Sequence, residues 1–155
     1  MVPPAELYRV VRRYANPFDL ASHEPVIQRL KEEREADLRR ALAIAPLHSS
    51  AGADAWLLPD AAWSRRVSGT FANRLARDDS ARAHAVVTPA SGDAYVVSLR
   101  SPREGGLSAS EFCRRFGAGG GRAVAAGIDR LPRSDLPRLL DALDETWGVR
   151  PQSLG

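Results

Sequence analysis

Two segments of the sequence carry residue types that can bind an anion, and the first is rich in glycine. Gly119, Gly120 and Gly121 follow one another and are succeeded by Arg122. Successive glycines permit positive φ and let backbone N–H groups converge without a Cβ in the way. Arg122 would add charge and paired donors. The segment predicts an anion-binding turn, with a flexible turn as the alternative, and its spacing matches neither a P-loop nor a dinucleotide fingerprint.

The second segment is Ser98-Leu99-Arg100-Ser101, at the end of a predicted strand. Strand alternation places Val96, Ser98 and Arg100 on one face and the intervening apolar residues on the other. A hydroxyl and a guanidinium then emerge side by side where the strand ends. Ser101 continues into the following loop. The segment indicates a second group of ligand-binding side chains, with an ordinary polar strand end as the alternative.

The elements that must position these residues alternate between strand and helix patterns. Strands are expected at residues 55–58, 84–88, 94–99 and 124–128. Trp63, Val67, Phe71 and Leu75 recur at helical spacing after Asp60, a candidate N-cap. Short apolar strands alternating with amphipathic helices favour an α/β fold, with a mixed sheet of about four to five strands flanked by helices.

Two further helices are predicted from local signatures. Ser108 and Glu111 fit a capping box, so a helix is expected to begin there and to end near Gly117. Ser134 is a candidate cap for a final helix with one apolar leucine-rich face.

A long N-terminal linker helix is expected over residues 23–45, before a linker near Pro46. Its charge-rich centre is typical of an exposed or bridging helix. The predicted organisation is an N-terminal segment and linker helix at residues 1–50 and an α/β domain at residues 51–155.

Composition sets limits on the class of protein. The chain has 155 residues, 44% of them apolar and 26% charged, which suits a globular domain with its own core. The net charge is +3, and Lys31 is the only lysine among 22 basic residues. Arginine suits phosphate recognition, although a GC-rich genome would also enrich it. We expect no membrane association, because no apolar run is long enough to span a bilayer.

The single cysteine, Cys113, and the three scattered histidines indicate no catalytic or metal-binding group. One cysteine excludes an internal disulfide and favours a reducing compartment, so a cytoplasmic location is expected. Cys113 is interpreted as a packed thiol. His84, which opens a predicted strand, is interpreted as structural.

Taken together, the two segments form a composite signature. A strand ending in Ser-Leu-Arg-Ser is followed by a helix, by Phe-Gly-x-Gly-Gly-Gly-Arg, and then by Ala-Ala-Gly at residues 125–127. This order resembles the DHH-associated domain at the C-terminal end of DHH-family phosphoesterases. The resemblance covers roughly residues 55–147, and its specific residues lie between Ala94 and Gly127. Arg122 departs from the family pattern, in which many members have histidine after the glycines.

The resemblance implies a function for the chain. In that family the associated domain holds the substrate for a two-metal centre, usually manganese, in a separate DHH domain. The resemblance assigns phosphate or substrate binding to seven residues: Ser98, Arg100, Ser101, Gly119, Gly120, Gly121 and Arg122. No Asp-His-His triplet occurs in the sequence. The expected activity is therefore substrate binding without hydrolysis by the chain itself.

The expected partners follow from that reading. They are single-stranded nucleic acid or a small nucleotide, and a DHH catalytic domain. No cofactor is expected in this chain, and manganese is expected in the catalytic domain that it lacks. The alternative is a stand-alone nucleotide-binding module, or a dimerisation module that pairs through the 23–45 helix. The residues do not decide between these readings.

Overall fold

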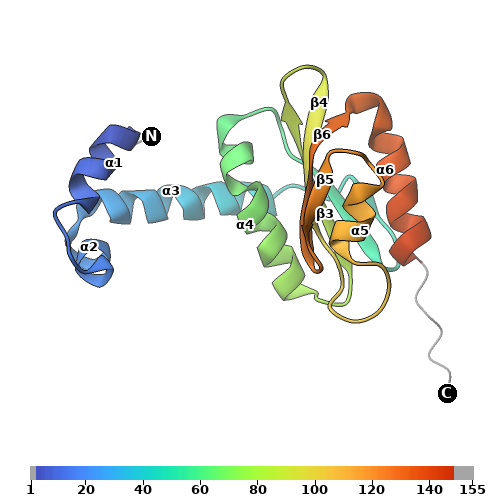
Figure 1. The fold of residues 1–155 in the computed structure, drawn as a ribbon, viewed down its shortest axis with the longest axis horizontal. Coiled ribbons are helices and arrows are strands. Elements are labelled where there is room, and N and C mark those ends of the chain that lie inside the picture. The colour runs from blue at the N-terminus through green and yellow to red at the C-terminus, as the bar shows by residue number, and fades with distance from the viewer. Residues whose placement is uncertain (1–2, 149–155) are drawn as a thin grey trace.

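A six-stranded mixed sheet lies at the centre of the structure, with the strand order β1-β2-β3-β4-β6-β5 (Figure 1). The computed structural model describes residues 3–148 of the chain. The strands are β1 (His48–Ser49), β2 (Ala53–Leu57), β3 (Ala83–Ala90), β4 (Ala94–Arg100), β5 (Gly119–Arg122) and β6 (Ala125–Pro132). β2 and β3 pair in parallel, and the other neighbours pair antiparallel.

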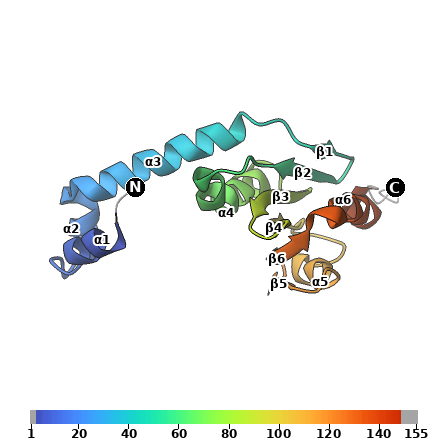
Figure 2. The ribbon, with the colours of Figure 1, turned by 90° about the horizontal axis from the view of Figure 1, so that it is seen from above.

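Helices cover both faces of this sheet and precede it. One face carries α4 (Ala62–Asp78), and the other carries α5 (Ala109–Arg114) and α6 (Leu136–Leu143) (Figure 2). The short turns η1 (Arg133–Asp135) and η2 (Asp144–Gly148) flank α6. An arm of three helices, α1 (Pro4–Val11), α2 (Pro17–His23) and α3 (Pro25–Leu42), extends from the α4 side of the domain. No helix among residues 3–148 is long and apolar enough to cross a membrane.

The predicted α/β class is confirmed, and the sheet has two strands that the sequence did not reveal. β1 falls in the segment interpreted as a linker, and β5 falls in the predicted glycine turn. Both are edge strands, short and poor in the β-branched and aromatic residues that mark a strand. The expected 23–45 helix is α3, which starts at Pro25 after a separate helix α2.

Two of the three predicted helix caps are wrong. Ser108 and Glu111 form the expected capping box at α5, and the hydrogen bonds from Ser108 hold the pKa of Glu111 below its usual value. Asp60 does not cap α4, which begins after Ala61; its carboxylate instead pairs with Arg65 at 2.8 Å. Ser134 lies within η1, before the N-cap of α6.

The core consists of two clusters, one on each face of the sheet. The strand residues Val97 and Leu99 pack with Phe112, Leu139 and Trp147 under α5 and α6. The other cluster lies under α4 and the end of α3, and its largest members are Trp56, Leu58, Val67, Phe71 and Val86. Cys113 is fully buried in the first cluster, as predicted, and burial raises the pKa of its thiol to about 11.

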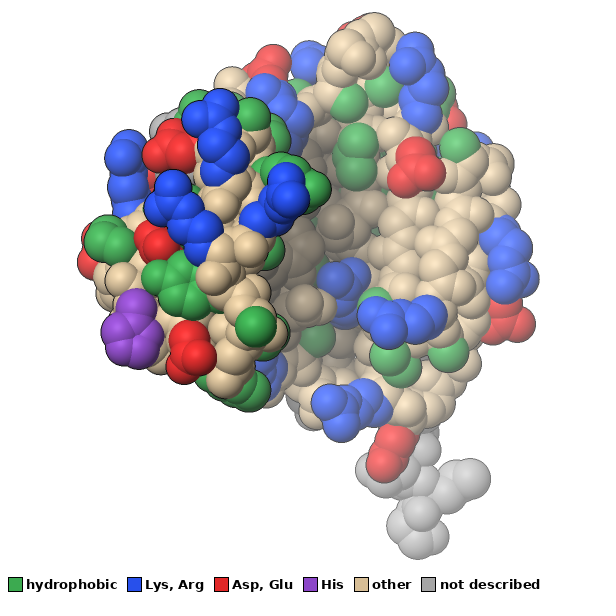
Figure 3. Space-filling view, turned by 60° about the vertical axis from the view of Figure 1, so that its left-hand side comes forward, with side chains coloured by type: hydrophobic (Ala, Val, Ile, Leu, Met, Phe, Trp, Pro, Cys, Tyr) green, Lys and Arg blue, Asp and Glu red, His purple; other side chains and the backbone are tan. Residues whose placement is uncertain are grey.

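Helix α4 leaves part of its own face of the sheet uncovered. It packs on β3 and on β4, while β6 and β5 lie beyond it (Figure 2). The space-filling view shows a hollow between the N-terminal arm and the α/β domain, with Lys and Arg side chains along its sides (Figure 3). The fold therefore presents an open half-sheet on the side from which Arg100 projects.

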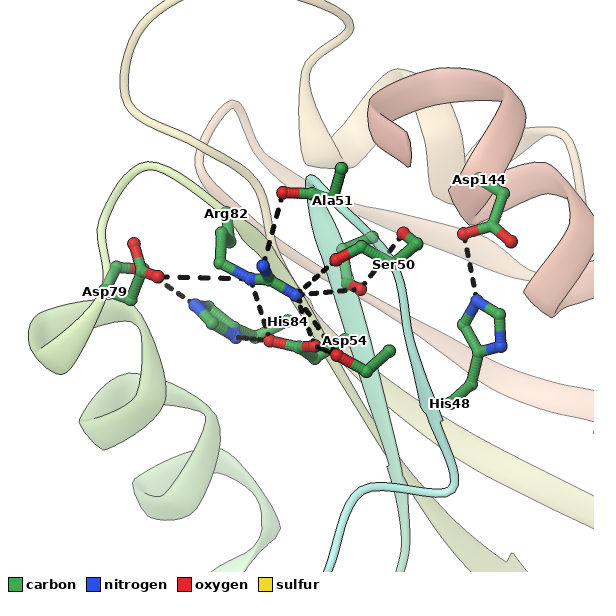
Figure 4. A network of polar contacts seen from close by, with 10 residues as sticks. His48, Ser50, Ala51, Asp54, Asp79, Arg82, His84 and Asp144 are labelled. Carbon is green, nitrogen blue, oxygen red and sulfur yellow. Dashed lines mark hydrogen bonds and ion pairs between the residues drawn. The ribbon is translucent and has the colours of Figure 1, made fainter. Parts of the chain in front are cut away.

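A network of polar contacts ties β1 and β2 to the end of α4 (Figure 4). Arg82 donates to Asp54 Oδ2 at 3.0 Å and to the Ser50 carbonyl at 2.6 Å. His84 is buried, and its Nε2 lies 2.7 Å from the Asp79 carbonyl oxygen. Nearby, His48 Nε2 lies 2.9 Å from Asp144 Oδ1, and this contact lowers the pKa of Asp144. The structural interpretation of His84 agrees with this packing.

Helix α3 is fixed to α4 by one buried carboxylate. Asp37 is 4% exposed and accepts hydrogen bonds from Arg66 Nη2 at 2.7 Å and Nε at 3.1 Å. Arg40 adds a third donor, at 3.3 Å. The arm is therefore anchored to the domain through charge-assisted bonds rather than by apolar contact alone.

We expect Asp37→Ala to loosen this anchor strongly. The substitution leaves Arg66 without its buried partner, which should cost about 2–3 kcal/mol. Because α3 is peripheral, amide hydrogen exchange should accelerate in α3 and α4 and stay slow in the sheet. Glu33→Ala is the control, since the Glu33–Arg29 pair is exposed and should contribute under about 0.5 kcal/mol. Equal effects of the two substitutions would contradict the anchoring role.

Candidate functional site

Arg100 and Arg122 come together through the register of the sheet. Arg100 on β4 is paired with Ala125 on β6, and Ala125 is paired with Arg122 on β5. Two adjacent strand spacings of about 4.8 Å separate the arginine backbones, and the intervening side chain is only a methyl group. The two cations therefore face one another across a small residue on the half-sheet that α4 leaves open.

The Arg100 guanidinium is held by the protein in one orientation. Its Nε donates to Asn73 Oδ1 at 2.8 Å, and its Nη1 donates to its neighbour's carbonyl, the Leu99 oxygen, at 2.8 Å. Burial lowers the pKa of Arg100, and the positive charge of Arg122 lowers it further. Within residues 3–148, no carboxylate forms an ion pair with either arginine. A bound anion would offset this repulsion.

Ser101 serves mainly to position the turn between β5 and β6. It is 6% exposed, and its hydroxyl donates to the Ala123 carbonyl at 3.2 Å. Its backbone N–H donates to the Val124 carbonyl at 3.3 Å. These bonds fix the end of β4 to the turn that follows Arg122. Ser101 thus holds the two arginine-bearing strands together at the site.

The arginines line a cleft of about 430 Å³, which we call the arginine cleft. Arg77 from α4 and Arg103 from the β4–α5 loop join Arg100 and Arg122 in its wall. The remaining lining residues are neutral: Asn73, Ala76, Ser80, Ser101, Val124 and Ala125. None of the four arginines is in an ion pair in the part of the chain that the structure describes. The cleft therefore combines four arginines with no acidic residue in its lining.

The predicted glycine turn is a strand. The glycines form β5, and they are absent from the residues that line the cleft. A Cβ at Gly119 would lie 2.1 Å from the Cys113 carbonyl oxygen, and one at Gly121 would lie 2.5 Å from Ala126 Cα. These two glycines allow close packing of β5 on α5 and β6. Gly120 is exposed with open space beside it, so direct anion binding by the glycines stays a prediction.

Of the seven predicted site residues, three line the arginine cleft and one lies near it. Arg100, Ser101 and Arg122 are in its wall. Ser98 is half-buried and pairs with Gly127, two residue pairs along the sheet from the Arg100–Ala125 pair. Sequence reasoning missed Arg77 and Arg103. Arg103 directly extends the Ser98–Ser101 segment, whereas Arg77 on α4 could be found only by knowing how α4 crosses the sheet.

No group of three or more His, Cys, Asp or Glu side chains among the described residues is arranged to hold a metal ion. Asp78 and Asp79, which flank the lining residues Arg77 and Ser80 in sequence, pair with Arg74 and Arg82. The side chains around the arginine cleft therefore do not fit a two-metal centre, and we derive no metal-dependent step on this chain.

The fold and the cleft define an α/β domain with an arginine-lined cleft on a half-covered sheet. The sequence model of the DHHA1 domain family matches residues 47–148, which is more than half of the chain. The protein belongs to the DHHA1 domain family.

Two solved structures share the fold. RecJ from Thermus thermophilus, solved in complex with Mn²⁺, matches with a TM-score of 0.61 and 21% identity over 91% of this chain. The pGpG-specific phosphodiesterase PggH from Vibrio cholerae matches with a TM-score of 0.55 and 11% identity over 90% of this chain. This chain spans 21% of the first structure and 48% of the second. No curated protein matches its sequence.

Proposed function

We propose that this domain binds the phosphate groups of a nucleic acid or nucleotide and presents them to the catalytic half of a DHH-type phosphodiesterase. The observation that carries the proposal is the arginine cleft, where four arginines meet without a carboxylate. Guanidinium groups without a carboxylate partner can bind phosphate through charge-assisted hydrogen bonds. Arg100 supports this role because Asn73 already fixes its orientation.

The charge balance of the cleft favours a polyanion over a neutral ligand. Burial lowers the pKa of Arg100 and the charge of Arg122 lowers it further, so the cleft holds a repulsion between cations that phosphate would relieve. Its volume, about 430 Å³, lies in the range of small-ligand pockets. None of its lining residues is aromatic, so base stacking within the cleft contributes nothing. Binding there should depend on phosphate charge and therefore on salt.

Hydrolysis is proposed to belong to a metal-binding DHH domain on the same protein or on a partner. The Mn²⁺ complex of RecJ supports manganese as that domain's metal. In this arrangement the arginine cleft holds the substrate at the open half of the sheet, between α4 and the β5–β6 turn. A stand-alone nucleotide-binding module would use the same cleft without hydrolysis.

The test is binding of a labelled short single-stranded oligonucleotide, measured by fluorescence anisotropy across a salt series. Wild-type protein should bind with an affinity that falls steeply with salt. Arg100→Ala/Arg122→Ala should bind about 100-fold or more weakly, because each charged hydrogen bond contributes about 1.5–3 kcal/mol. For this variant, the slope of log affinity against log salt concentration should decrease in magnitude by about 0.7 for each phosphate that it no longer neutralises.

A variant that loses the same number of positive charges elsewhere distinguishes binding in the arginine cleft from nonspecific electrostatic attraction of the oligonucleotide. Arg115 and Arg130 are exposed and lie outside the cleft, so Arg115→Ala/Arg130→Ala is the matched control. Its affinity should stay within about threefold of wild type, as expected for charges screened from the ligand. If both double variants weaken binding equally, the cleft is not the site.

A further inference from the structure

The arginine cleft offers a ligand many hydrogen-bond donors and few acceptors. A guanidinium group donates through each of its nitrogen atoms and accepts nothing. Arg77, Arg103 and Arg122 are exposed residues of the cleft wall, so their N–H groups are open to a ligand. Arg100 adds the N–H groups that its own bonds to the protein leave free. A ligand in this cleft must therefore supply acceptors.

The acceptors in the same wall are mostly in use. Asn73 Oδ1 already accepts the Arg100 Nε–H at 2.8 Å. The Val124 carbonyl oxygen accepts the Ser101 N–H at 3.3 Å, and the Ser101 side chain is buried. The Ser80 hydroxyl remains exposed, and no acidic residue lines the cleft. A ligand that carries many donors of its own therefore finds few partners in this cleft.

This shortage of acceptors disfavours the nucleoside part of a nucleotide. Sugar hydroxyls and base amino groups are donors, and a donor that is buried without an acceptor loses its bonds to water. A base would also find no aromatic ring in the lining on which to stack. The oxygen atoms of an ionised phosphate, in contrast, are acceptors. The hydrogen-bonding groups of the cleft therefore match phosphate, and the nucleosides of a bound nucleic acid would lie outside it.

The concentration of charge favours several phosphates that are joined directly to one another. Four guanidinium groups line a cleft of about 430 Å³. Burial lowers the pKa of Arg100 and the charge of Arg122 lowers it further, so these cations repel one another. In a nucleic-acid strand a sugar separates each phosphate from the next, whereas in a condensed phosphate a single bridging oxygen does. A condensed phosphate therefore brings more negative charge into this volume than a nucleic-acid strand does.

We propose that the arginine cleft is also a binding site for condensed inorganic phosphate, of which tripolyphosphate is a short form. Its oxygen atoms accept hydrogen bonds, and its phosphates follow one another without sugar or base. The triphosphate chain of a nucleoside triphosphate has the same chemistry, and its nucleoside should add nothing to the affinity. Competition with nucleic acid rests on the function proposed above, whereas binding of the phosphate chain does not. Condensed phosphate would then act as an inhibitor at the substrate site.

Calorimetry on the full chain, in metal-free buffer at fixed ionic strength, tests the binding. The probes are tripolyphosphate, adenosine triphosphate, and a thymidine tetranucleotide that has three phosphates and none at its ends. Tripolyphosphate should bind at least about tenfold more tightly than the tetranucleotide, as expected for one or more additional charge-assisted hydrogen bonds. Adenosine triphosphate should bind within about threefold of tripolyphosphate, because its nucleoside forms no further hydrogen bond. A tetranucleotide that binds as tightly as tripolyphosphate would overturn the proposal, as would adenosine triphosphate that binds about tenfold more tightly.

Two double variants locate the binding of tripolyphosphate. Arg77→Ala/Arg103→Ala removes two exposed donors from the cleft wall and should weaken this binding about tenfold or more. Arg115→Ala/Arg130→Ala removes the same charge outside the cleft and should leave the affinity within about threefold of wild type. Equal losses in the two variants would overturn the proposal, because they would show a general attraction of the anion to the protein.

A competition experiment connects this ligand to nucleic acid. Tripolyphosphate should raise the apparent Kd of the labelled oligonucleotide in proportion to its concentration, whereas sulfate at equal ionic strength should not. An oligonucleotide that stays bound in saturating tripolyphosphate would show that the two ligands do not share the cleft and would overturn the proposal. If the oligonucleotide does not bind the wild-type protein, the function proposed above fails, and calorimetry of tripolyphosphate with the two double variants decides the present proposal by itself.

Discussion

Replacing Gly119 with alanine should destabilise the protein by about 2–4 kcal/mol, the cost of forcing an atom into a packed site. The added Cβ would lie 2.1 Å from the Cys113 carbonyl oxygen and 2.4 Å from its carbonyl carbon. Backbone atoms at the end of α5 cannot rotate away as a side chain would, so β5 must shift or leave the sheet. The measurement is urea unfolding followed by circular dichroism.

The neighbouring glycine provides the control for this substitution. A Cβ at Gly120 would meet no atom within 4 Å, so Gly120→Ala should change stability by less than about 0.5 kcal/mol. The two residues are adjacent in one strand and differ only in the face toward which a side chain would point. Equal stability of the two variants would mean that β5 does not pack against the end of α5 as it does in this structure.

The glycine series also separates packing from ligand contact. Gly120→Ala keeps the fold and places a methyl group on the exposed side of β5, the side on which alternation puts Arg122. If the glycine backbone binds phosphate directly, this variant should bind oligonucleotide more weakly at unchanged stability. If the glycines serve only to place Arg122, its affinity should equal that of wild type.

The parts of the fold that could be predicted are those set by local side-chain patterns. Alternation along β4 placed Val97 and Leu99 in the core and Arg100 on the opposite face, and the structure agrees. The α5 capping box was equally local, because Ser108 and Glu111 satisfy each other's backbone groups. In both cases the decisive contacts lie within a few residues of one another in sequence.

Most of the features that the sequence did not predict depend on contacts between residues that lie far apart in the sequence. Gly119 looks like a turn residue on its own, and its role as a packing residue is visible only once Cys113 lies against it. Asp60 has the right type for a cap, yet its carboxylate is drawn to Arg65 on the first turn of α4. Arg77 joins the candidate site only because α4 crosses the sheet at β3 and β4. Sequence alone does not show which of many arginines share one cleft.

The grouping of arginines in the cleft lowers the stability of the folded protein. Arg100 is partly withdrawn from water beside a second cation, and both effects lower its pKa. A surface selected for stability alone would place a carboxylate there, as it does for Arg66 and Arg82. Such unfavourable charge groupings concentrate at functional sites, which is why the absence of a carboxylate from the lining of the cleft weighs more than the number of arginines.

Substitution of Arg100 by lysine should weaken oligonucleotide binding about tenfold or more, although the charge is kept. Lysine has neither the Nε that donates to Asn73 nor the planar fork that is held against the Leu99 carbonyl. Its ammonium group would be a mobile point charge on a flexible chain. Asn73→Ala should produce a smaller loss in the same direction, because it frees the guanidinium without removing it.

Arg103→Lys is the matched comparison, since Arg103 is exposed in the same cleft and has no side-chain hydrogen bond within the described chain. Its affinity should remain within about threefold of wild type, because lysine supplies the same charge to a phosphate. Anisotropy titrations at one salt concentration measure both variants. A tenfold difference between them would show that the cleft recognises phosphate through a guanidinium held in place, and equal small losses would show that it acts only as a diffuse positive surface.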